Sequence, residues 1–232
     1  MLRDLKYTGL VFLLFFALQA SGQKNPSFVG MRIGPSIPYA DFGPGGTVKT
    51  HAFAGLGGSI KSEIAYFYSP NVGVGFLAGF NIHPVDTDEF EKQVSGDQMA
   101  VSNLEIESQW YYSSNYMIGY YFNNPITYTI LSFTSNIMIG FMWMRTPATN
   151  FHYDISHLAS ITVHQPSANN ANFAFFFSLG LKAKLTEQFD LNLSGDYLGS
   201  KYNLNFHSIE GVEEVEKHLS LINVNLGLSY RF

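Results

Sequence analysis

The chain has 232 residues, of which 46% are hydrophobic, 16% aromatic and only 13% charged, and its formal net charge is −5. This acidic balance provides no basic surface for nucleic acid, so that class of partner is excluded. The chain contains no cysteine, which excludes disulfides and a cysteine-linked lipid anchor.

The first 22 residues have the features of a secretory signal peptide. Two basic residues precede an apolar run from residue 10 to residue 18, and the small residues Ala20-Ser21-Gly22 follow it. A transmembrane helix needs about 20 apolar residues, and no run of that length follows anywhere in the chain. We therefore expect residues 1–22 to be removed and residues 23–232 to form one domain without helical spans.

Apolar and polar residues then alternate along eight stretches, as they do in strands whose two faces meet different surroundings. We expect strands at 28–38, 52–68, 72–83, about 104–122, 127–145, 173–185, 189–206 and 218–232. Tight turns are expected at 69–71, 123–125 and 186–188, and longer loops at 39–50, 84–103, 146–172 and 207–217. The apolar parity changes near Gly199, which suggests a bulge there.

The last stretch has the clearest alternation. From Ile222 to Phe232 every second residue is apolar, and the residues between them are polar or small. A barrel strand in a membrane has this pattern, because its outer face meets hydrocarbon and its inner face meets a polar lumen. We therefore predict an all-β fold, an eight-stranded antiparallel up-and-down transmembrane β-barrel. The alternative, a soluble lipocalin-like barrel, would place the apolar faces inside and polar residues outside.

Aromatic residues gather near the strand ends, where the interface girdles of such barrels lie. Those expected at the membrane interface are Tyr66, Tyr120, Tyr128, Phe189, Tyr230 and Phe232 at the turn ends and Trp110 and Trp143 nearer the loop ends. By analogy with other barrels of this kind, the short turns and both mature termini should face the periplasm and the loops the outside.

The signal peptide, the eight alternating strands and the terminal Leu-Gly-Leu-Ser-Tyr-Arg-Phe together resemble the small outer-membrane barrels of the OmpA/OmpX type. More closely, the chain resembles the outer membrane protein beta-barrel domain family (PorT-like) of Bacteroidota. The resemblance implies that the C-terminal strand is recognised by the outer-membrane assembly machinery. It implies contact with outer-membrane lipid and lipopolysaccharide, and it leaves the activity open, because members serve as anchors, adhesins and secretion accessories.

The inward parity collects charged residues that we expect to form a lumen charge network. They are Arg32, Lys61, Glu63, Lys182, Lys184, Asp190, Asp196 and Arg231. An eight-stranded barrel is only just wide enough for its own side chains, so these charges should pair and plug the lumen. The alternative is a narrow pore with a charged constriction.

The expected loops offer weaker candidates for binding. Acidic residues crowd two of them: Asp86, Asp88, Glu89, Glu91 and Asp97 in one, and Glu210, Glu213, Glu214 and Glu216 in the other. They form a solvated rim, or they gather divalent cations shared with lipopolysaccharide phosphates. The longest loop carries His152, His157 and His164, which could bind zinc, but their irregular spacing favours ordinary polar surface and no metal.

One arrangement of residues could support catalysis. Some eight-stranded barrels modify lipid A, and His218 and Ser220 share the lipid-facing parity near the outer end of the last strand, where Glu210 or Glu216 could orient the histidine. Known deacylases of this kind have asparagine after the serine, whereas Leu221 follows here. We therefore predict no catalytic residues, no cofactor and no enzyme. The expected role is an outer-membrane platform for surface loops or a component of an envelope or secretion assembly, with a lipid A-modifying enzyme or a small pore as alternatives.

Overall fold

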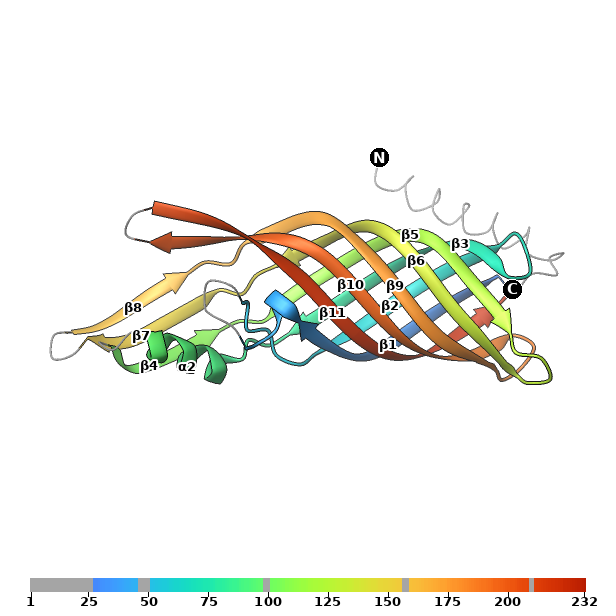
Figure 1. The fold of residues 1–232 in the computed structure, drawn as a ribbon, viewed down its shortest axis with the longest axis horizontal. Coiled ribbons are helices and arrows are strands. Elements are labelled where there is room, and N and C mark those ends of the chain that lie inside the picture. Colours follow the sequence, from blue (N-terminus) through green and yellow to red (C-terminus); the bar gives the residue numbers. More distant parts are fainter. Residues whose placement is uncertain (1–26, 46–50, 98–100, 156–158, 209–210) are drawn as a thin grey trace, which may run out of the picture.

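The computed structural model describes residues 27–45, 51–97, 101–155, 159–208 and 211–232, so the expected signal peptide lies outside the described residues. Eight antiparallel strands close into a barrel in the order β1-β11-β10-β9-β6-β5-β3-β2 (Figure 1). The barrel strands are β1 (Phe28–Tyr39), β2 (Gly57–Phe67), β3 (Val72–His83), β5 (Tyr111–Pro125), β6 (Leu131–Arg145), β9 (Asn169–Lys184), β10 (Phe189–Ser208) and β11 (Gly211–Arg231). The predicted fold class is confirmed.

The barrel closes where the first strand meets the last. β1 pairs with β11 from Phe28 opposite Arg231 to Tyr39 opposite Ser220, and no strand edge is left open along the membrane-facing wall. Closure satisfies the backbone hydrogen-bonding groups that hydrocarbon could not satisfy. Phe232 donates from its backbone N–H to the Ser27 carbonyl (3.0 Å), which ties both described ends of the chain together at the turn end of the barrel.

The barrel has its apolar side chains on the outside. On β3, Phe76 and Phe80 are 44% and 42% exposed, whereas the inward neighbours Leu77 and Asn81 are fully buried. A soluble barrel would not expose a continuous phenylalanine-rich wall to water. The structure therefore excludes the lipocalin-like alternative, because the outer face is suited to hydrocarbon.

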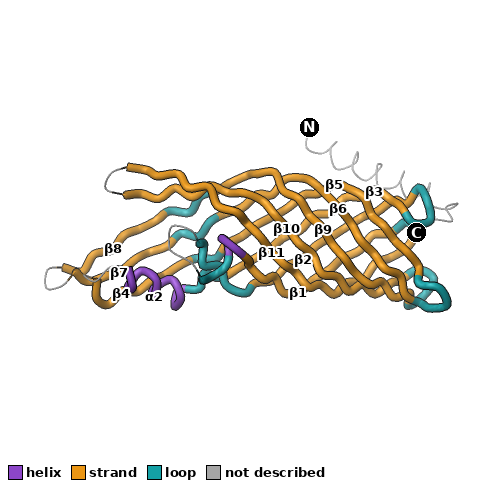
Figure 2. The backbone as a smooth tube through the Cα atoms, viewed as in Figure 1, coloured by secondary structure: helices purple, strands orange, loops and turns teal. Residues whose placement is uncertain are grey.

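Beyond one end of the barrel the chain builds an ordered crown, which we define as η2 (Ala40–Phe42), α2 (Thr87–Asp97) and a sheet of β4 (Val101–Ser108), β7 (Thr149–Ile155) and β8 (Ala159–Gln165). The sheet order β4-β7-β8 repeats the order β5-β6-β9 of the barrel strands that follow or precede these strands in the chain. The crown sheet is thus an extension of one side of the barrel wall (Figures 1 and 2). No helix within the described residues has the length and apolarity to cross a membrane.

The crown corrects the loop expectations at 84–103 and 146–172, since both stretches contain regular structure. The expected fourth strand is interrupted at Gln109, whose backbone N–H donates to the Ala148 carbonyl (3.0 Å) across the kink. A corresponding bond from Thr146 to the Ala168 carbonyl (2.9 Å) spans the kink on the neighbouring strands. Pro147 and Pro166 lie in these kinks. Because proline has no backbone N–H to donate to a neighbouring strand, these residues made the sequence look like a loop.

Three further boundaries differ from expectation. The second turn lies at 126–130 and not at 123–125, because Pro125 ends β5 opposite Ser132 of β6. The expected loop at 207–217 is mostly strand, since β10 and β11 continue to Ser208 opposite Gly211 as one long hairpin. The second strand was expected to begin at Ala52, but it begins five residues later, at Gly57.

The expected bulge near Gly199 is wrong. The pairing of β10 with β11 is unbroken from Phe189 opposite Tyr230 to the tip. The apolar residues change parity because the lumen itself changes character along the barrel: Leu198 and Tyr202 point inward and are fully buried.

Candidate functional site

The centre of the lumen holds a compact ion-pair network from three strands. Arg32 of β1 contacts Glu63 of β2 (Nη2 to Oε2, 3.1 Å) and Asp196 of β10 (Nη1 to Oδ1, 3.2 Å). Lys61 of β2 contacts the other oxygen of Asp196 (Nζ to Oδ2, 3.0 Å). All four residues are buried, and their two positive and two negative charges balance. Charges in a water-poor interior are stable only when opposite charges and hydrogen bonds offset the loss of hydration.

Neutral side chains complete the hydrogen bonding of this network. Asn225 donates from Nδ2 to Asp196 Oδ2 (2.6 Å), and Ser178 donates to Asp196 Oδ1 (2.5 Å). Tyr121 donates its hydroxyl to Glu63 Oε2 (2.9 Å). The Asp196 carboxylate therefore accepts from several strands at once and is the structural centre of the lumen.

The other predicted lumen charges lie closer to the turn end and do not join this network. Asp190 pairs with Arg231 (Oδ1 to Nη2, 3.0 Å), and the Lys182 ammonium lies over the Phe28 ring, 3.6 Å from its centroid. Lys184 pairs with Glu187 (2.8 Å) at the exposed turn, where this hydrogen bond lowers the pKa of the Glu187 carboxyl. Residues of equal inward parity therefore divide into the central network and separate contacts nearer the turn end.

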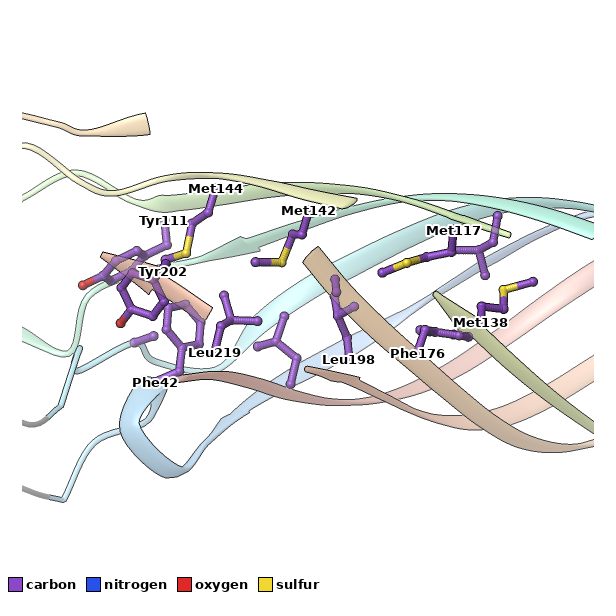
Figure 3. Close-up of a cluster of buried hydrophobic side chains, with 14 of the residues drawn as sticks. Phe42, Tyr111, Met117, Met138, Met142, Met144, Phe176, Leu198, Tyr202 and Leu219 are labelled. Carbon is purple, nitrogen blue, oxygen red and sulfur yellow. The ribbon is translucent and has the colours of Figure 1, made fainter. Parts of the chain in front are cut away.

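Between the charged network and the crown, the lumen is filled by an apolar layer that the sequence analysis did not identify. Its buried residues include Met117, Met138, Met142, Met144, Phe176, Leu198, Leu219 and Leu221 (Figure 3). The four methionines lie at inward-facing positions of β5 and β6. Methionine at inward positions of these strands, where polar residues are expected, was the sequence signal that could have revealed the layer. Flexible thioether side chains fill an irregular space well.

Aromatic residues cover the apolar layer at the crown end. Phe42 of η2 packs edge-on against Tyr111 (ring centroids 5.1 Å apart) and Tyr202 (6.1 Å). Lys217 of β11, above the membrane-facing part of that strand, donates to the His51 carbonyl (2.7 Å), and burial lowers the pKa of its ammonium to about 8. These contacts hold Phe42 of η2 and the backbone of His51 at the crown end of the barrel.

The cavities agree with a closed lumen. The cavity beside Arg32 and Glu63 measures about 30 Å³, which has room for one or two water molecules. A cavity of about 40 Å³ lies at the base of the crown beside Tyr111 and Lys217. The wide cavity of about 380 Å³ opens at the turn end, below the charged network.

The acidic residues of the first acidic stretch organise α2 and the crown sheet. Asp86 accepts the backbone N–H of Glu89 (3.1 Å), which caps the first turn of α2. Glu91 accepts the backbone N–H of Ile106 (3.0 Å), so the helix covers the outer edge of β4. In the second acidic stretch, Glu210 lies outside the described residues, while Glu213, Glu214 and Glu216 lie on the β10–β11 hairpin.

The structure does not bring the loop histidines into one ligand set. His152 of β7 contacts Thr162 (Nδ1 to Oγ1, 2.9 Å) and lies 3.8 Å from Glu107, whereas His164 of β8 contacts Asn150 (2.7 Å). His157 lies outside the described residues. Among the residues that the structure describes, no group of three metal-ligating side chains could hold an ion.

His218 and Ser220 lie near the crown end of β11. Ser220 is buried, with 7% of the residue exposed, and its hydroxyl lies 3.0 Å from the Tyr197 hydroxyl. His218 is exposed, and its backbone N–H approaches the Asp41 carboxylate (3.5 Å). No hydrogen bond joins the described side chains of His218 and Ser220.

The aromatic residues expected at the membrane interface all point outward. At the turn end, Tyr66 and Tyr120 flank Val74 of β3 from the strands on its two sides, and Tyr230 packs against Phe189 (ring centroids 5.5 Å apart). Tyr128 and Phe232 are exposed at the same end, and Trp110 and Trp143 are exposed toward the crown. The exposed residues between these levels include Ile118, Ile139 and Phe175.

The family comparison agrees with the fold. Residues 8–232 match the family model described as outer membrane protein beta-barrel domain. No curated protein matches the chain. Among solved structures, the chain is similar to Neisserial surface protein A (TM-score 0.46, 9% identity, 89% of this chain and 97% of that one covered). It is also similar to Ail of Yersinia pestis (0.45, 13%, 90% and 100%) and to the outer membrane protein AlkL (0.46, 12%, 91% and 92%).

Proposed function

The chain belongs to the outer membrane protein beta-barrel domain family, and from this premise we propose that it serves as a sealed membrane anchor presenting its crown at the cell surface. The crown would engage an envelope or extracellular protein partner, and the barrel would hold it in place. The terminal Leu-Gly-Leu-Ser-Tyr-Arg-Phe and the glycine-rich first hairpin support the narrower assignment to the PorT-like group.

The single observation that carries this proposal is the contrast between the two parts of the molecule. The described lumen is filled by an ion-pair network and an apolar layer, whereas the chain beyond the barrel is built into a sheet with a covering helix. A transport function would need an open path, and binding functions are commonly carried by extensions on a rigid scaffold. The filled lumen therefore favours a binding role over the small-pore alternative.

The proposed orientation places the crown outside and the turns and both mature termini in the periplasm. Its support is the asymmetry between the ends, since barrels of this kind have short periplasmic turns and longer extracellular loops. The crown would then lie among lipopolysaccharide headgroups, with the acidic side chains near α2 facing their cation-bridged phosphates. The aromatic residues of the turn end would lie at the periplasmic interface, and those toward the crown at the outer one.

The lipid A-modifying alternative receives less support from the geometry. A catalytic serine needs a base within hydrogen-bonding reach. The Ser220 hydroxyl is instead 3.0 Å from the hydroxyl of Tyr197, and no hydrogen bond among the described residues joins it to a carboxylate or an imidazole. We therefore retain the non-enzymatic role as the proposal.

Electrical recording tests the sealed lumen. Purified barrel inserted into a planar lipid bilayer should give no unitary conductance, because ions would have to cross both the balanced ion-pair network and the apolar layer. An open porin recorded in the same bilayer is the positive control. Stable single-channel steps from this protein would favour the pore.

The lack of cysteine makes the orientation directly measurable. Cysteine placed at Val163 of β8, a residue 43% exposed in the crown, should react with a membrane-impermeant maleimide on intact cells. Cysteine placed at the exposed Glu187 of the opposite turn is the matched control, and it should react only after the outer membrane is permeabilised. The reverse pattern of labelling would show that the crown faces the periplasm.

A further inference from the structure

The turn end of the barrel contains a vestibule that the proposed surface role does not use. We give this name to the cavity of about 380 Å³ lined by Lys182, Lys184, Asp190 and Arg231 together with residues of the turns and neighbouring strand ends. Its volume falls within the range of small-molecule sites. Its charged side chains all come from β9, β10 and β11, which lie next to one another in the barrel.

The charge available in the vestibule is positive. Three of its four charged lining residues are cationic, and the single carboxylate, Asp190, is 2% exposed and already paired with Arg231 (3.0 Å). Lys184 is engaged by Glu187 at the rim (2.8 Å). The remaining cation, Lys182, thus forms no ion pair with a described residue, and the carboxylates of Glu63 and Asp190 attract it only at longer range.

Lys182 is a buried cation that forms no ion pair within the described barrel. Its side chain is 9% exposed, and its ammonium lies over the Phe28 ring (3.6 Å) without an ion pair or hydrogen bond to any described residue. Lys61, which is equally inward-facing, pairs with Asp196 at 3.0 Å. A buried charge is costly unless it is paired. An anion that enters from outside would supply the ion pair that the described residues do not give to Lys182.

The position of Lys182 places this ammonium within reach of a ligand. Lys182 lines both the vestibule and the small cavity beside Arg32 and Glu63, and it therefore forms the floor between them. The Phe28 ring holds one side of the ammonium and leaves its N–H donors for an acceptor on the other side. An oxyanion that enters the vestibule would meet this ammonium at its inner end.

We propose that the vestibule binds a small molecule carrying a phosphate or carboxylate group, with Lys182 as the anchoring cation. Lys184 and Arg231 line the same cavity, but each is paired with a carboxylate, so the positive charge that attracts an anion is that of Lys182. The vestibule opens along the barrel axis at the turn end, so a soluble anion fits it better than the headgroup of a lipid packed against the outer wall. The proposal concerns the end opposite the crown and does not depend on the role proposed for the crown.

The test uses the full mature barrel in maltoside micelles, a detergent that contains no phosphate. Sodium phosphate and, separately, sodium succinate are titrated at constant ionic strength, and the backbone amide signals of Asn71 and Ser132, both lining residues, are followed by NMR. We expect saturable shifts in the millimolar range with at least one of the two anions and none with sodium chloride. Lys182→Met should weaken binding roughly tenfold or more, because a charged hydrogen-bond donor is lost.

A variant with the same change of charge provides the control. Lys92→Met removes a lysine from α2 at the other end of the molecule, where its side chain is 73% exposed, and it should leave anion binding unchanged. Equal loss in both variants would reduce the effect to net charge and overturn the proposal. Unchanged binding in Lys182→Met, or no saturable binding to the wild-type barrel, would also overturn it.

A measurement on the unmodified chain keeps the proposal testable should Lys182→Met fail to fold. Acylation of lysines by acetic anhydride is quantified by mass spectrometry with and without phosphate or succinate, and the anion should slow the modification of Lys182 several-fold while that of Lys92 is unaffected. Repeating this in nanodiscs with and without phosphatidylglycerol separates the two sources of phosphate. If protection required the anionic lipid and not the soluble anion, the proposal that the ligand is soluble would be wrong. If no condition gave protection, the proposal that the vestibule binds anions would be wrong.

Discussion

Replacing Asp196 with asparagine should lower the free energy of unfolding of the barrel by about 3 to 5 kcal/mol, the usual cost of removing one partner from a buried ion pair. Asp196 pairs with both Arg32 (3.2 Å) and Lys61 (3.0 Å), so the substitution leaves two buried cations facing the single carboxylate of Glu63. Asparagine preserves the shape of the side chain, which confines the change to charge. Urea unfolding in lipid vesicles, followed by the different gel mobilities of folded and unfolded barrel, measures the effect.

The matched control is Glu187→Gln, which makes the same carboxylate-to-amide change at the turn end. The ion pair of Glu187 with Lys184 (2.8 Å) is exposed to water, and exposed pairs contribute little to stability. Its unfolding curve should overlay that of the wild type. If Asp196→Asn did so as well, the lumen network would not be a stabilising element of this barrel.

Replacing Ile139 with arginine should lower the free energy of unfolding by about 2 to 4 kcal/mol, as charged residues do near the midplane on the lipid face of a barrel. Ile139 is 54% exposed on β6 and pairs with Ile118 and Phe175, in the exposed band between the aromatic residues of the two ends. Hydrocarbon cannot solvate the guanidinium that this substitution places in it. The same vesicle-based unfolding experiment gives the magnitude.

Val163→Arg provides the comparison, because Val163 is exposed to a similar extent (43%) but lies on β8 of the crown. Water surrounds this position in the proposed arrangement, so the arginine should cost nothing measurable. A large loss in both variants would place the crown in hydrocarbon, and no loss in either would remove the lipid-facing assignment of the β6 outer face.

The strand alternation was readable in the sequence because it is local. β3 occupies the expected residues 72–83, and the apolar parity of β11 down to Phe232 marks its lipid side without reference to any other strand. A side chain in a strand faces one of two environments, and these differ in polarity wherever the lumen is polar. Pattern alone therefore gives the number of barrel strands and the fold class, and it shows which residues face inward where the lumen is polar.

The arrangement inside the barrel could not be predicted in this way. Arg32 and Asp196 are 164 positions apart, and the height at which they meet depends on the register around the barrel. The same register separates Lys182 and Arg231 from the central network, although all four residues share the inward parity. Parity shows that a charge points inward but not which charge lies opposite it.

The sequence by itself therefore determined the membrane-type alternation and the apolar parity of the terminal strand, while the signal peptide expected at residues 1–22 stays a prediction. Only the tertiary structure decided that the upper lumen is apolar, that the stretches read as loops extend the wall as β4, β7 and β8, and that Lys182 forms no ion pair with a described residue. The physical reason is that burial and charge pairing are properties of contacts between distant strands. In the sequence an inward methionine such as Met142 departs from the polar pattern, and only the folded barrel brings Leu198 of β10 and Leu219 of β11 into the same buried cluster.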